Sequence, residues 1–592
     1  MSSLYPSQSA GKRIYWLLTI EWSGLVIRLA NDQVDVESDT GAVYQFSAGL
    51  DDVEVSEAID LIGDSAGQLS VPLEFIPPGD VSITERIALG DDFSAARGEL
   101  SRWVEGTNYE ERRVVLRGRL TDPEYGADGE PIATSLEEML IDDQTLVPSP
   151  FQLVASASWF TFADLPSTSK GAPYPIVIGK PGRVSTSISV RNWVTGSPGI
   201  WVYHDPHDEG AFYSRLILLI AGHHVRARRV YLNHADDTLG KRFRVVNGWD
   251  DLGQPIAFVP FYLTTTSDQQ IVYDGTATYT TYNATDPDFS PAGPSYGLGD
   301  KTLDYDTWQA DPERQLYVGW YDGNDDDSAT GGGLMMEGGI VREAGDVIEY
   351  LLGLTSQTVD RARIAAAKPL LSRFLLDGVI TDRISPWDVL KDEILSLLPV
   401  SICSGPNGLY LIVWRFDATA ADATVRIDAD ANPAIDRVDR VKYDDSERAN
   451  RLSLSYAYSY RTSRHVQTLT FGTAADKVED DAVVIHPACE RGRARTGVVA
   501  ERSVSSAWVY DDATAYAVLE WMAAAYATSA RSVQYRVPES EFVHVERGMV
   551  ATLTDADLYL SDAVSLVREV VTDGSGYLTL TLWMLDNPQA RT

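Results

Sequence analysis

Residues 451–460 read RLSLSYAYSY, and this stretch shows the period that dominates the whole chain. Apolar residues and serines alternate in it: Leu452, Leu454, Tyr456, Tyr458 and Tyr460 against Ser453, Ser455 and Ser459. Successive side chains of a β-strand point to opposite faces of the sheet, so a period of two predicts a strand that is buried on one face.

The same period recurs towards both ends of the chain. RRVVLRGRL (112–120) alternates apolar residues with arginines, and GYLTLTLWM (576–584) alternates leucines with threonines. Turn-forming residues at 405–408 (GPNG) and 573–576 (DGSG) each separate two such runs, which predicts β-hairpins. The predicted fold class is therefore mainly β with α+β elements.

Helical spacing is found in a few stretches only: 94–106, 345–354, 385–399 and 511–530. In the third stretch, Ser385 is the expected N-cap and Pro386 the first helical residue. In the fourth, Asp511 or Asp512 is the expected N-cap. The apolar stripe of each helix is expected to pack into a core.

The chain has 592 residues, which is too many for a single core and suggests roughly three to five domains. Shifts in composition favour four units. They are a β-rich unit at 1–150, a β-rich insertion at 151–340, a mixed α/β unit at 341–430, and a β-rich unit with one helix at 431–592.

The chain is strongly acidic, with 86 Asp and Glu against 49 Lys and Arg and a formal net charge of −37. Such a surface repels nucleic acid and anionic lipid, so a sequence-specific nucleic-acid reader is not expected. Two interpretations stay open. The acidity keeps a large protein soluble, or it lines a path along which DNA passes without sticking.

The N-terminus, MSSLYPSQSAGKRIYWLLTIEW, does not have the form of a signal peptide. Its apolar run at 14–18 is too short, and Glu21 follows closely. We therefore expect synthesis in the cytoplasm without an export signal. No stretch approaches the ~20 apolar residues of a membrane span, so none is expected.

The chain has two cysteines, Cys403 and Cys489, which lie far apart in sequence. This count excludes a disulfide framework and a zinc module built on four cysteines. Two separate buried thiols are expected, and a single bridge between them stays an alternative.

Residues 63–67 (GDSAG) match G-x-S-x-G, the nucleophile-elbow pattern of α/β-hydrolases. That motif works where a strand enters a strained turn and then a helix, which lifts the serine above the sheet. Here the following residues, 69–75, alternate like a strand. Ser65 is therefore interpreted as part of a turn before a strand, and no catalytic residue is assigned.

Two acidic loops have part of the EF-hand spacing. In the loop that begins at Asp322, Asp327 stands where glycine is needed and Gly333 where a bidentate acid is needed. In the loop at 428–439, Pro433 occupies the glycine position, and its locked φ prevents the sharp turn. Both are interpreted as solvated loops, and a weak cation site within 322–327 stays open.

Five of the eight histidines lie close together in sequence: His204, His207, His223, His224 and His234. Three histidines with an open position could hold zinc, but these lack a ligand spacing. Surface or core histidines are the preferred interpretation, and neither a metal nor a cofactor is expected.

The stretches 100–138, 171–182, 346–415 and 513–555, taken in this order, resemble the hub proteins at the tail tip or baseplate of long-tailed bacteriophages. The resemblance starts at 100–138, where Gly118, Pro123 and Gly126 fit a G-x-x-x-x-P-x-x-G turn. It continues at 171–182 (GAPYPIVIGKPG) and through 346–415. It ends at 513–555, where Gly548 opens a G-x-V-x-x-x-T-D strand. The region 183–340 has no good counterpart.

The resemblance implies a structural virion protein with β-barrel-like tube domains at the two ends of the chain, a small middle domain and an insertion. It further implies a homotrimer that forms a ring at the distal end of the tail and functions in host attachment and DNA ejection. The implied partners are a distal tail protein or the tail tube, the tape-measure protein, and fibre or receptor-binding proteins, with DNA passing through the lumen. No enzyme activity is expected.

Two other functions remain as alternatives. One is a tail-associated hydrolase, either an esterase or a cell-wall-degrading enzyme, which would use Ser65 or an unrecognised carboxylate pair. The other is a carbohydrate-binding adhesin built on 183–340. Its candidate aromatic platforms are Trp193, Trp201, Trp249, Trp308 and Trp320.

Overall fold

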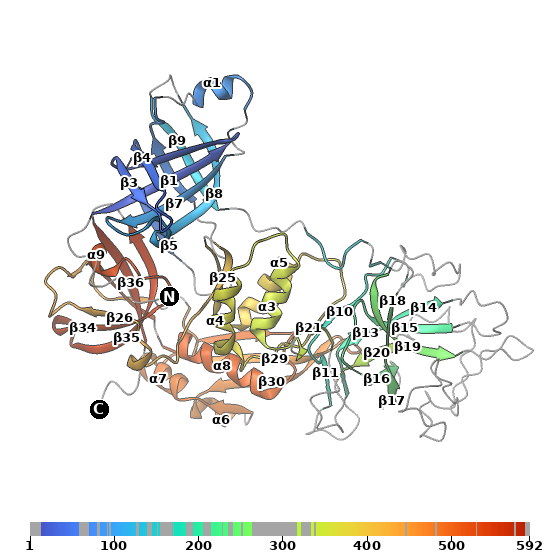
Figure 1. Cartoon of the computed structure of the whole chain (residues 1–592). Helices are drawn as coiled ribbons and strands as arrows, with labels where there is room; N and C mark the ends of the chain where they lie inside the picture. The colour runs from blue at the N-terminus through green and yellow to red at the C-terminus, as the bar shows by residue number, and fades with distance from the viewer. Residues whose placement is uncertain are drawn as a thin grey trace, which may run out of the picture.

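The computed structural model describes residues 13–585 with internal gaps. The gaps are 52, 59–69, 80–82, 92, 94–95, 126–129, 139–144, 151, 154–168, 170, 185–192, 205–214, 228, 235–240, 250–252, 263–315, 321–332, 337–338, 406, 445–446, 480–481, 529 and 573–575. The fold is mainly β, as predicted, and consists of several sheets (Figure 1). Within the described residues, no helix is long and apolar enough to span a bilayer.

The N-terminal barrel is an eight-stranded sheet in the order β3-β4-β2-β1-β7-β8-β9-β6. Its elements are β1 (Ile14–Trp22), β2 (Leu25–Ala30), β3 (Val34–Glu37), β4 (Val43–Ala48), β6 (Ser70–Phe75), α1 (Ile83–Ala88), β7 (Arg97–Val104), β8 (Arg113–Glu124) and β9 (Ile132–Glu138). The sheet closes after β4, where Ile76 N donates to Gly49 O and Asp51 N donates to Glu74 O. A Cβ on Gly49 would lie 2.4 Å from Ile76 O, so this closure requires glycine.

Alternation inside the barrel follows the predicted pattern in β6. Val71, Leu73 and Phe75 are buried, whereas the residues between them are exposed. The predicted strand after the G-x-S-x-G stretch is therefore confirmed. The helix predicted at 94–106 is wrong, because β7 lies there between β1 and β8. Pairing on both sides overrides the helical spacing of a short apolar segment.

The C-terminal half-barrel is a curled sheet in the order β26-β34-β35-β36-β33-β27, with two further strands attached. Its elements are β26 (Val425–Asp428), β27 (Asp436–Arg437), β28 (Lys442–Asp444), β33 (Ala530–Pro538), α9 (Glu539–Phe542), β34 (Val550–Asp555), β35 (Leu560–Thr572) and β36 (Tyr577–Met584). The predicted alternation in β36 is seen in Leu578, Leu580 and Leu582, which are buried in its core.

The N-terminal barrel and the C-terminal half-barrel repeat one pattern of strands. In sequence, β6, α1, β7, β8 and β9 correspond to β33, α9, β34, β35 and β36. In space, the order β7-β8-β9-β6 corresponds to β34-β35-β36-β33. The corresponding strands β8 and β35 are both long, with 12 and 13 residues. Each has a bulge in its pairing with the next strand in sequence, β9 or β36.

A middle unit lies between these two units and the insertion. Its elements are α3 (Ala344–Gly353), α4 (Arg361–Leu371), β23 (Gly378–Ile380), α5 (Pro386–Asp388), β24 (Val400–Gly405), β25 (Gly408–Val413), β29 (Arg451–Ser459), β30 (Arg464–Gly472), α6 (Ala474–Glu479), β31 (Val483–Ile485), α7 (Pro487–Thr496), β32 (Glu501–Ser505) and α8 (Asp512–Tyr526). One hydrophobic cluster joins α3 and α4 to β29 and α8. The four-unit division stays a prediction, and this cluster contains residues from all four of those units, from Val147 to Ala527.

The helix signals of this unit are confirmed. Ser385 caps α5 by accepting a hydrogen bond from Trp387 N at 3.2 Å, and Pro386 occupies the first helical position. The helix then widens into a π-helical stretch, Val389–Ile394. Asp511 caps α8 and accepts a hydrogen bond from Thr514 N at 2.8 Å.

The alternation predicted for 451–460 fails in its second half. Leu452, Leu454 and Tyr456 are buried as predicted, but Ala457 has φ 57° and is buried too. The positive φ reverses the phase, so Ser459 is buried and Tyr458 is only half-buried. Ala457 N donates to Val509 O at 2.8 Å, which holds this conformation in place.

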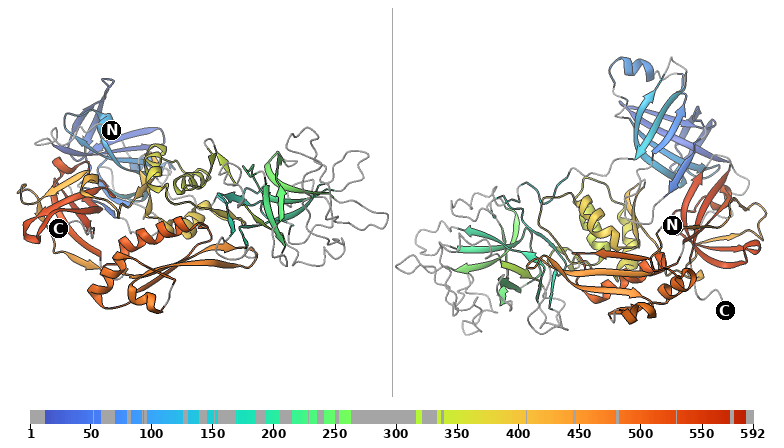
Figure 2. Two further views of the ribbon diagram at one scale, coloured as in Figure 1. Left: turned by 90° about the horizontal axis from the view of Figure 1, so that it is seen from below. Right: turned by 180° about the vertical axis from the view of Figure 1, so that it is seen from behind.

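The insertion contains two four-stranded sheets, in the orders β13-β20-β16-β17 and β14-β15-β19-β18. Its elements are β10 (Ile176–Ile178), β11 (Gly182–Val184), β12 (Trp193–Thr195), β13 (Ser197–Pro198), β14 (Ile200–His204), β15 (Arg215–Ala221), β16 (Arg229–His234), β17 (Lys241–Arg244), β18 (Val246–Trp249), β19 (Pro255–Tyr262), β20 (Leu316–Gly319), β21 (Met335–Met336) and β22 (Gly339–Ile340). In all views it projects from the middle unit on the side away from the N-terminal barrel and C-terminal half-barrel (Figures 1 and 2).

Within the insertion, His223 connects the segment after β15 to β10. Its Nε2 accepts a hydrogen bond from Val177 N at 2.9 Å, and its Nδ1 donates to His224 O at 3.0 Å. These bonds use both ring nitrogens of the neutral form. Burial lowers the pKa of His223 to about 4, and the hydrogen bond to the His224 carbonyl opposes this shift.

This depressed pKa predicts acid sensitivity. Between pH 6.5 and about 4 the unfolded chain binds a proton at His223 and the folded chain does not, so stability falls as the pH falls. The full effect is about 3 kcal/mol. Thermal unfolding followed against pH should show a shallower slope in this window for His223→Gln than for the natural chain. Equal slopes would show that His223 is not responsible.

Candidate functional site

The junction between the N-terminal barrel and the C-terminal half-barrel is the candidate functional site. The strand β5 (Val55–Ala58) belongs in sequence to the N-terminal barrel but pairs with β35 of the C-terminal half-barrel. The register is antiparallel, from Val55 opposite Thr572 to Ala58 opposite Glu569. Val55 is buried and belongs to the core of the N-terminal barrel. One four-residue segment therefore contributes to both units.

A buried ion pair lies at the same junction. Arg102 on β7 and Glu539 at the start of α9 have only 6% and 2% of their side chains exposed. Arg102 Nε donates to Glu539 Oε1 at 2.7 Å, and Nη2 donates to the same oxygen. The guanidinium also lies 4.3 Å from the centre of the Trp16 ring. Burial lowers the pKa of Arg102, and the Glu539 carboxylate opposes this shift.

A second arginine closes the rim of the junction. Arg113, at the start of β8, donates through Nη1 to Val543 O at 3.0 Å and to Val545 O at 3.4 Å. His544 lies between these carbonyls in sequence. Burial lowers the pKa of His544, and the Arg113 charge lowers it further. The junction is therefore held by backbone pairing, a desolvated ion pair and a charge-assisted contact with the segment after α9.

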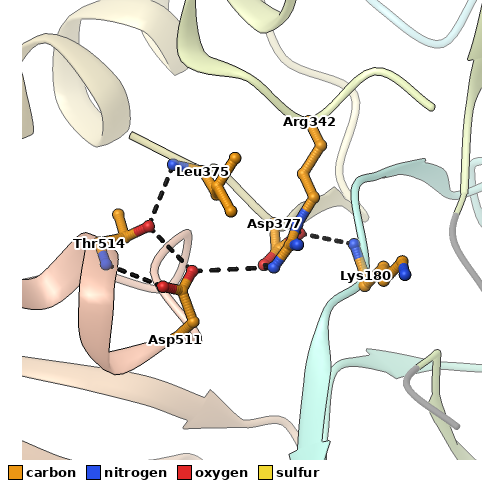
Figure 3. Close-up of polar contacts among 6 residues, drawn as sticks. All are labelled: Lys180, Arg342, Leu375, Asp377, Asp511 and Thr514. Atoms are coloured by element: carbon orange, nitrogen blue, oxygen red, sulfur yellow. Dashed lines mark hydrogen bonds and ion pairs between the residues drawn. The ribbon is translucent and has the colours of Figure 1, made fainter. Parts of the chain in front are cut away.

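A separate polar cluster anchors the insertion to the middle unit (Figure 3). Asp377, which is completely buried, accepts from Lys180 N at 2.7 Å, from Arg342 Nε at 2.6 Å and from Arg342 Nη2 at 2.8 Å. Lys180 follows the first strand of the insertion and Arg342 follows its last. Asp377 thus holds together both chain segments that connect the insertion to the rest of the protein.

Two neighbours complete this anchor. Gly179 has φ 67°, and a Cβ there would lie 2.2 Å from Asp377 Oδ1, so the turn requires glycine. Arg342 Nη2 also lies 3.7 Å from Asp511 Oδ2, the carboxylate that caps α8 (Figure 3). A second connection joins β12 to the end of β29, where Tyr460 N donates to Thr195 O at 2.9 Å.

Arg102, Glu539 and Asp377 are not among the candidate site residues predicted from the sequence. The two residues of the ion pair are 437 positions apart, and no local spacing connects them. Arg102 also falls in the stretch that was predicted to be a helix. If the stretch is interpreted as a strand, Arg102 falls among residues that are expected to be buried. A charged residue in such a position indicates an internal charge that is paired with an opposite charge.

Several residues considered in the sequence lie outside the described residues. They include Ser65, the loop at 322–332, His207 and Trp308; for His204, His234, Trp193 and Trp201 the side chains are not described. Ser65 therefore stays interpreted from its neighbours. In the part of the chain that the structure describes, no three His, Cys, Asp or Glu residues cluster as metal ligands.

In the described loop at 428–439, the side chains of Asp428 and Asp430 accept hydrogen bonds from backbone N–H groups of this chain. Asp428 accepts from Ala431 N at 3.0 Å, and both carboxylate oxygens of Asp430 lie 3.1 Å from Ala556 N. Asn432 Nδ2 donates to Glu541 Oε2 at 3.0 Å. The Asp430 contact fixes the loop against the hairpin that joins β34 and β35, and the Asn432 contact fixes it to α9.

The cysteines, histidines and tryptophans have different environments. Cys403 and Cys489 are free, buried and in different hydrophobic clusters, as expected. Trp320 is completely buried and donates to Ser197 Oγ. Trp249 is 63% exposed, and its ring contacts that of His224 edge to face at 4.8 Å. Among the five tryptophans proposed as platforms, Trp249 has an exposed side chain and Trp320 does not.

The ion pair predicts a large effect of a small change. Glu539→Gln leaves Arg102 buried without a counter-charge, and we expect the free energy of unfolding to fall by about 3–5 kcal/mol. The matched control is Glu520→Gln, since Glu520 pairs with Arg373 at 3.3 Å with 47% of its side chain exposed. That control should cost less than about 1 kcal/mol in urea unfolding. Similar losses for both variants would contradict the assignment.

Asp377 gives a second prediction. Asp377→Asn turns an amide group toward donors that need an acceptor, and we expect a loss of about 2–3 kcal/mol. Hydrogen exchange at the Lys180 amide should also accelerate, because that amide loses its charged acceptor. Asp417→Asn is the control, since Asp417 is 60% exposed in its pair with Arg415. Unchanged exchange at Lys180 would rule out the anchoring role.

Comparison with known proteins gives structural neighbours only. No family model matches the chain, and a search of curated proteins finds none that matches. A tail protein from Neisseria meningitidis MC58 aligns over 97% of this chain and 99% of its own, with 9% identity and a TM-score of 0.34.

Two further solved structures are similar. The 43 kDa tail protein of prophage MuSo2 from Shewanella oneidensis aligns over 97% of this chain and 100% of its own, with 10% identity and a TM-score of 0.30. A chain of the native gene transfer agent virion aligns over 42% of this chain and 79% of its own, with 15% identity and a TM-score of 0.17. The similarity is therefore to tail and virion proteins, at TM-scores that are all below 0.5.

Proposed function

We propose that this chain is a structural virion protein of a phage tail, and that it acts as the hub at the distal tail end. In this role three copies form a ring that continues or closes the tail tube and anchors tip or fibre proteins. The tape-measure protein and a distal tail protein are the proposed neighbours along the axis. The proposed role is non-enzymatic.

The observation that carries this proposal is the repeated unit. The N-terminal barrel and the C-terminal half-barrel share one order of strands and are joined by β5 and the Arg102–Glu539 pair. Two related units in a fixed orientation let a ring of three chains present six similar surfaces. A hexameric tube can then continue onto a trimer.

The charge of the chain fits the passage of DNA. A formal charge of −37 repels the phosphate backbone, so a lumen lined by acidic side chains would not retain DNA during ejection. Host attachment would then depend on proteins bound outside the ring. The insertion, which projects away from the N-terminal barrel and C-terminal half-barrel, is the part of this chain most available to them (Figure 2).

Assembly of the purified chain tests the proposal. Mass photometry should show a species of three chains, each of 65.0 kDa, and negative-stain electron microscopy should show a ring with a central opening. The ring should form at micromolar concentration without nucleic acid. A chain that stays monomeric up to the highest soluble concentration would refute the hub assignment.

A further inference from the structure

The repeat relates residues of the N-terminal barrel to residues of the C-terminal half-barrel one by one. Pairing between β7 and β8 runs from Arg97 opposite Arg119 to Arg102 opposite Arg113. Pairing between β34 and β35 runs from Val550 opposite Leu566 to Asp555 opposite Leu560. Arg102 therefore corresponds to Asp555, and Arg113 corresponds to Leu560.

In the C-terminal half-barrel, one face of this repeat is covered by the N-terminal barrel. The pairing of β35 with β34 ends at Leu566. Beyond this residue, the segment 569–572 of β35 pairs with β5 instead. The segment after α9 is covered too, because Arg113 donates to Val543 O and Val545 O. Backbone pairing and a side-chain contact thus protect this face inside the chain.

The corresponding face of the N-terminal barrel has no such cover from the described residues. The pairing of β8 with β7 ends at Arg119. Beyond this residue, the segment 121–124 of β8 pairs with β9 along one edge, and no described strand pairs with its other edge. Leu89, in the segment after α1, is 78% exposed. Tyr125, which follows β8, is 45% exposed. An open strand edge that continues into the exposed Tyr125 marks a place where another chain can pair, and Leu89 is a second exposed apolar side chain of the same barrel.

The complementary feature is the tip of the hairpin between β34 and β35. Tyr559 there is 96% exposed and has φ 55°. Asp555 fixes the turn by accepting from Asp557 N at 3.0 Å and Leu558 N at 3.3 Å. Asp430 holds Ala556 N from the other side. The tip is a preorganised turn that presents an aromatic side chain, the residue type most enriched in interface hot spots.

We propose that copies of this chain associate head to tail, with the Tyr559 tip of one copy on the Leu89 segment of the next. In the contact within the chain, Arg113 meets Val543–Val545. In the proposed contact between chains, the corresponding partners are Leu560 of one copy and the segment after α1 of the next. The contact between chains would then lie at the same place in the repeat as the contact within the chain, with the apolar Leu560 in place of the charged Arg113. It also joins Leu89 and Tyr559, the two most exposed large apolar residues among those described.

This contact is heterologous, because it joins two different surfaces of identical chains. Such contacts build closed rings when the rotation between neighbours divides a full turn, and filaments when it does not. The inference rests on the proposed function for the closed ring, and it adds the pair of surfaces that would form it. An open edge at 121–124 would gain a strand from the neighbour, as β35 gains β5.

Cysteine cross-linking between copies tests the contact. Leu89→Cys and Tyr559→Cys are prepared as separate single variants, mixed, and mildly oxidised; Cys403 and Cys489 are buried and do not interfere. We expect a disulfide-linked pair containing one copy of each variant. Val43→Cys replaces Leu89→Cys in the control mixture, because Val43 is 57% exposed on the same barrel. The control should give no linked pair.

Association provides a second measurement. Leu89→Glu should weaken assembly at least tenfold in concentration, whereas Val43→Glu should leave it unchanged. If a ring forms but Leu89 and Tyr559 neither cross-link nor affect assembly, the proposed contact is wrong and the hub proposal stands. If the natural chain never assembles, both proposals fail.

Discussion

The relative position of the N-terminal barrel and the C-terminal half-barrel depends on the buried Arg102–Glu539 pair. An isolated charge in a dry interior is strongly unfavourable, so each partner is stable there only while the other is in place. The pair therefore makes one relative orientation of the two units far more favourable than others. The strand β5 strengthens this constraint, because its backbone pairs with one unit while Val55 lies in the core of the other.

A second buried charge has the same effect at the other end of the molecule. Asp377 joins Lys180 and Arg342, which lie on the two chain segments leading into and out of the insertion (Figure 3). Both junctions are thus fixed by a carboxylate that is almost or completely buried. A force applied to the insertion would be transmitted through the Asp377 contacts to the cap of α8, and so to the core of the middle unit.

The local features of the fold were largely predictable from sequence. Alternation predicted β6 and β36, and the capping residues Ser385 and Asp511 predicted where two helices begin. These features depend on neighbours only a few residues away. The failures arose where distant contacts decide. The stretch 94–106 is a strand because β1 and β8 pair with it on both sides, and the alternation of β29 reverses at Ala457, which bonds to Val509.

The sequence by itself determined the fold class, the separation of the two thiols and the strongly negative charge, because composition and short-range periodicity carry that information. The tertiary structure alone decided that Arg102 meets Glu539, that β5 crosses between units and that Asp377 anchors the insertion. These contacts join residues up to 437 positions apart. Only the packed chain brings them within hydrogen-bonding distance, where desolvation makes their pairing obligatory.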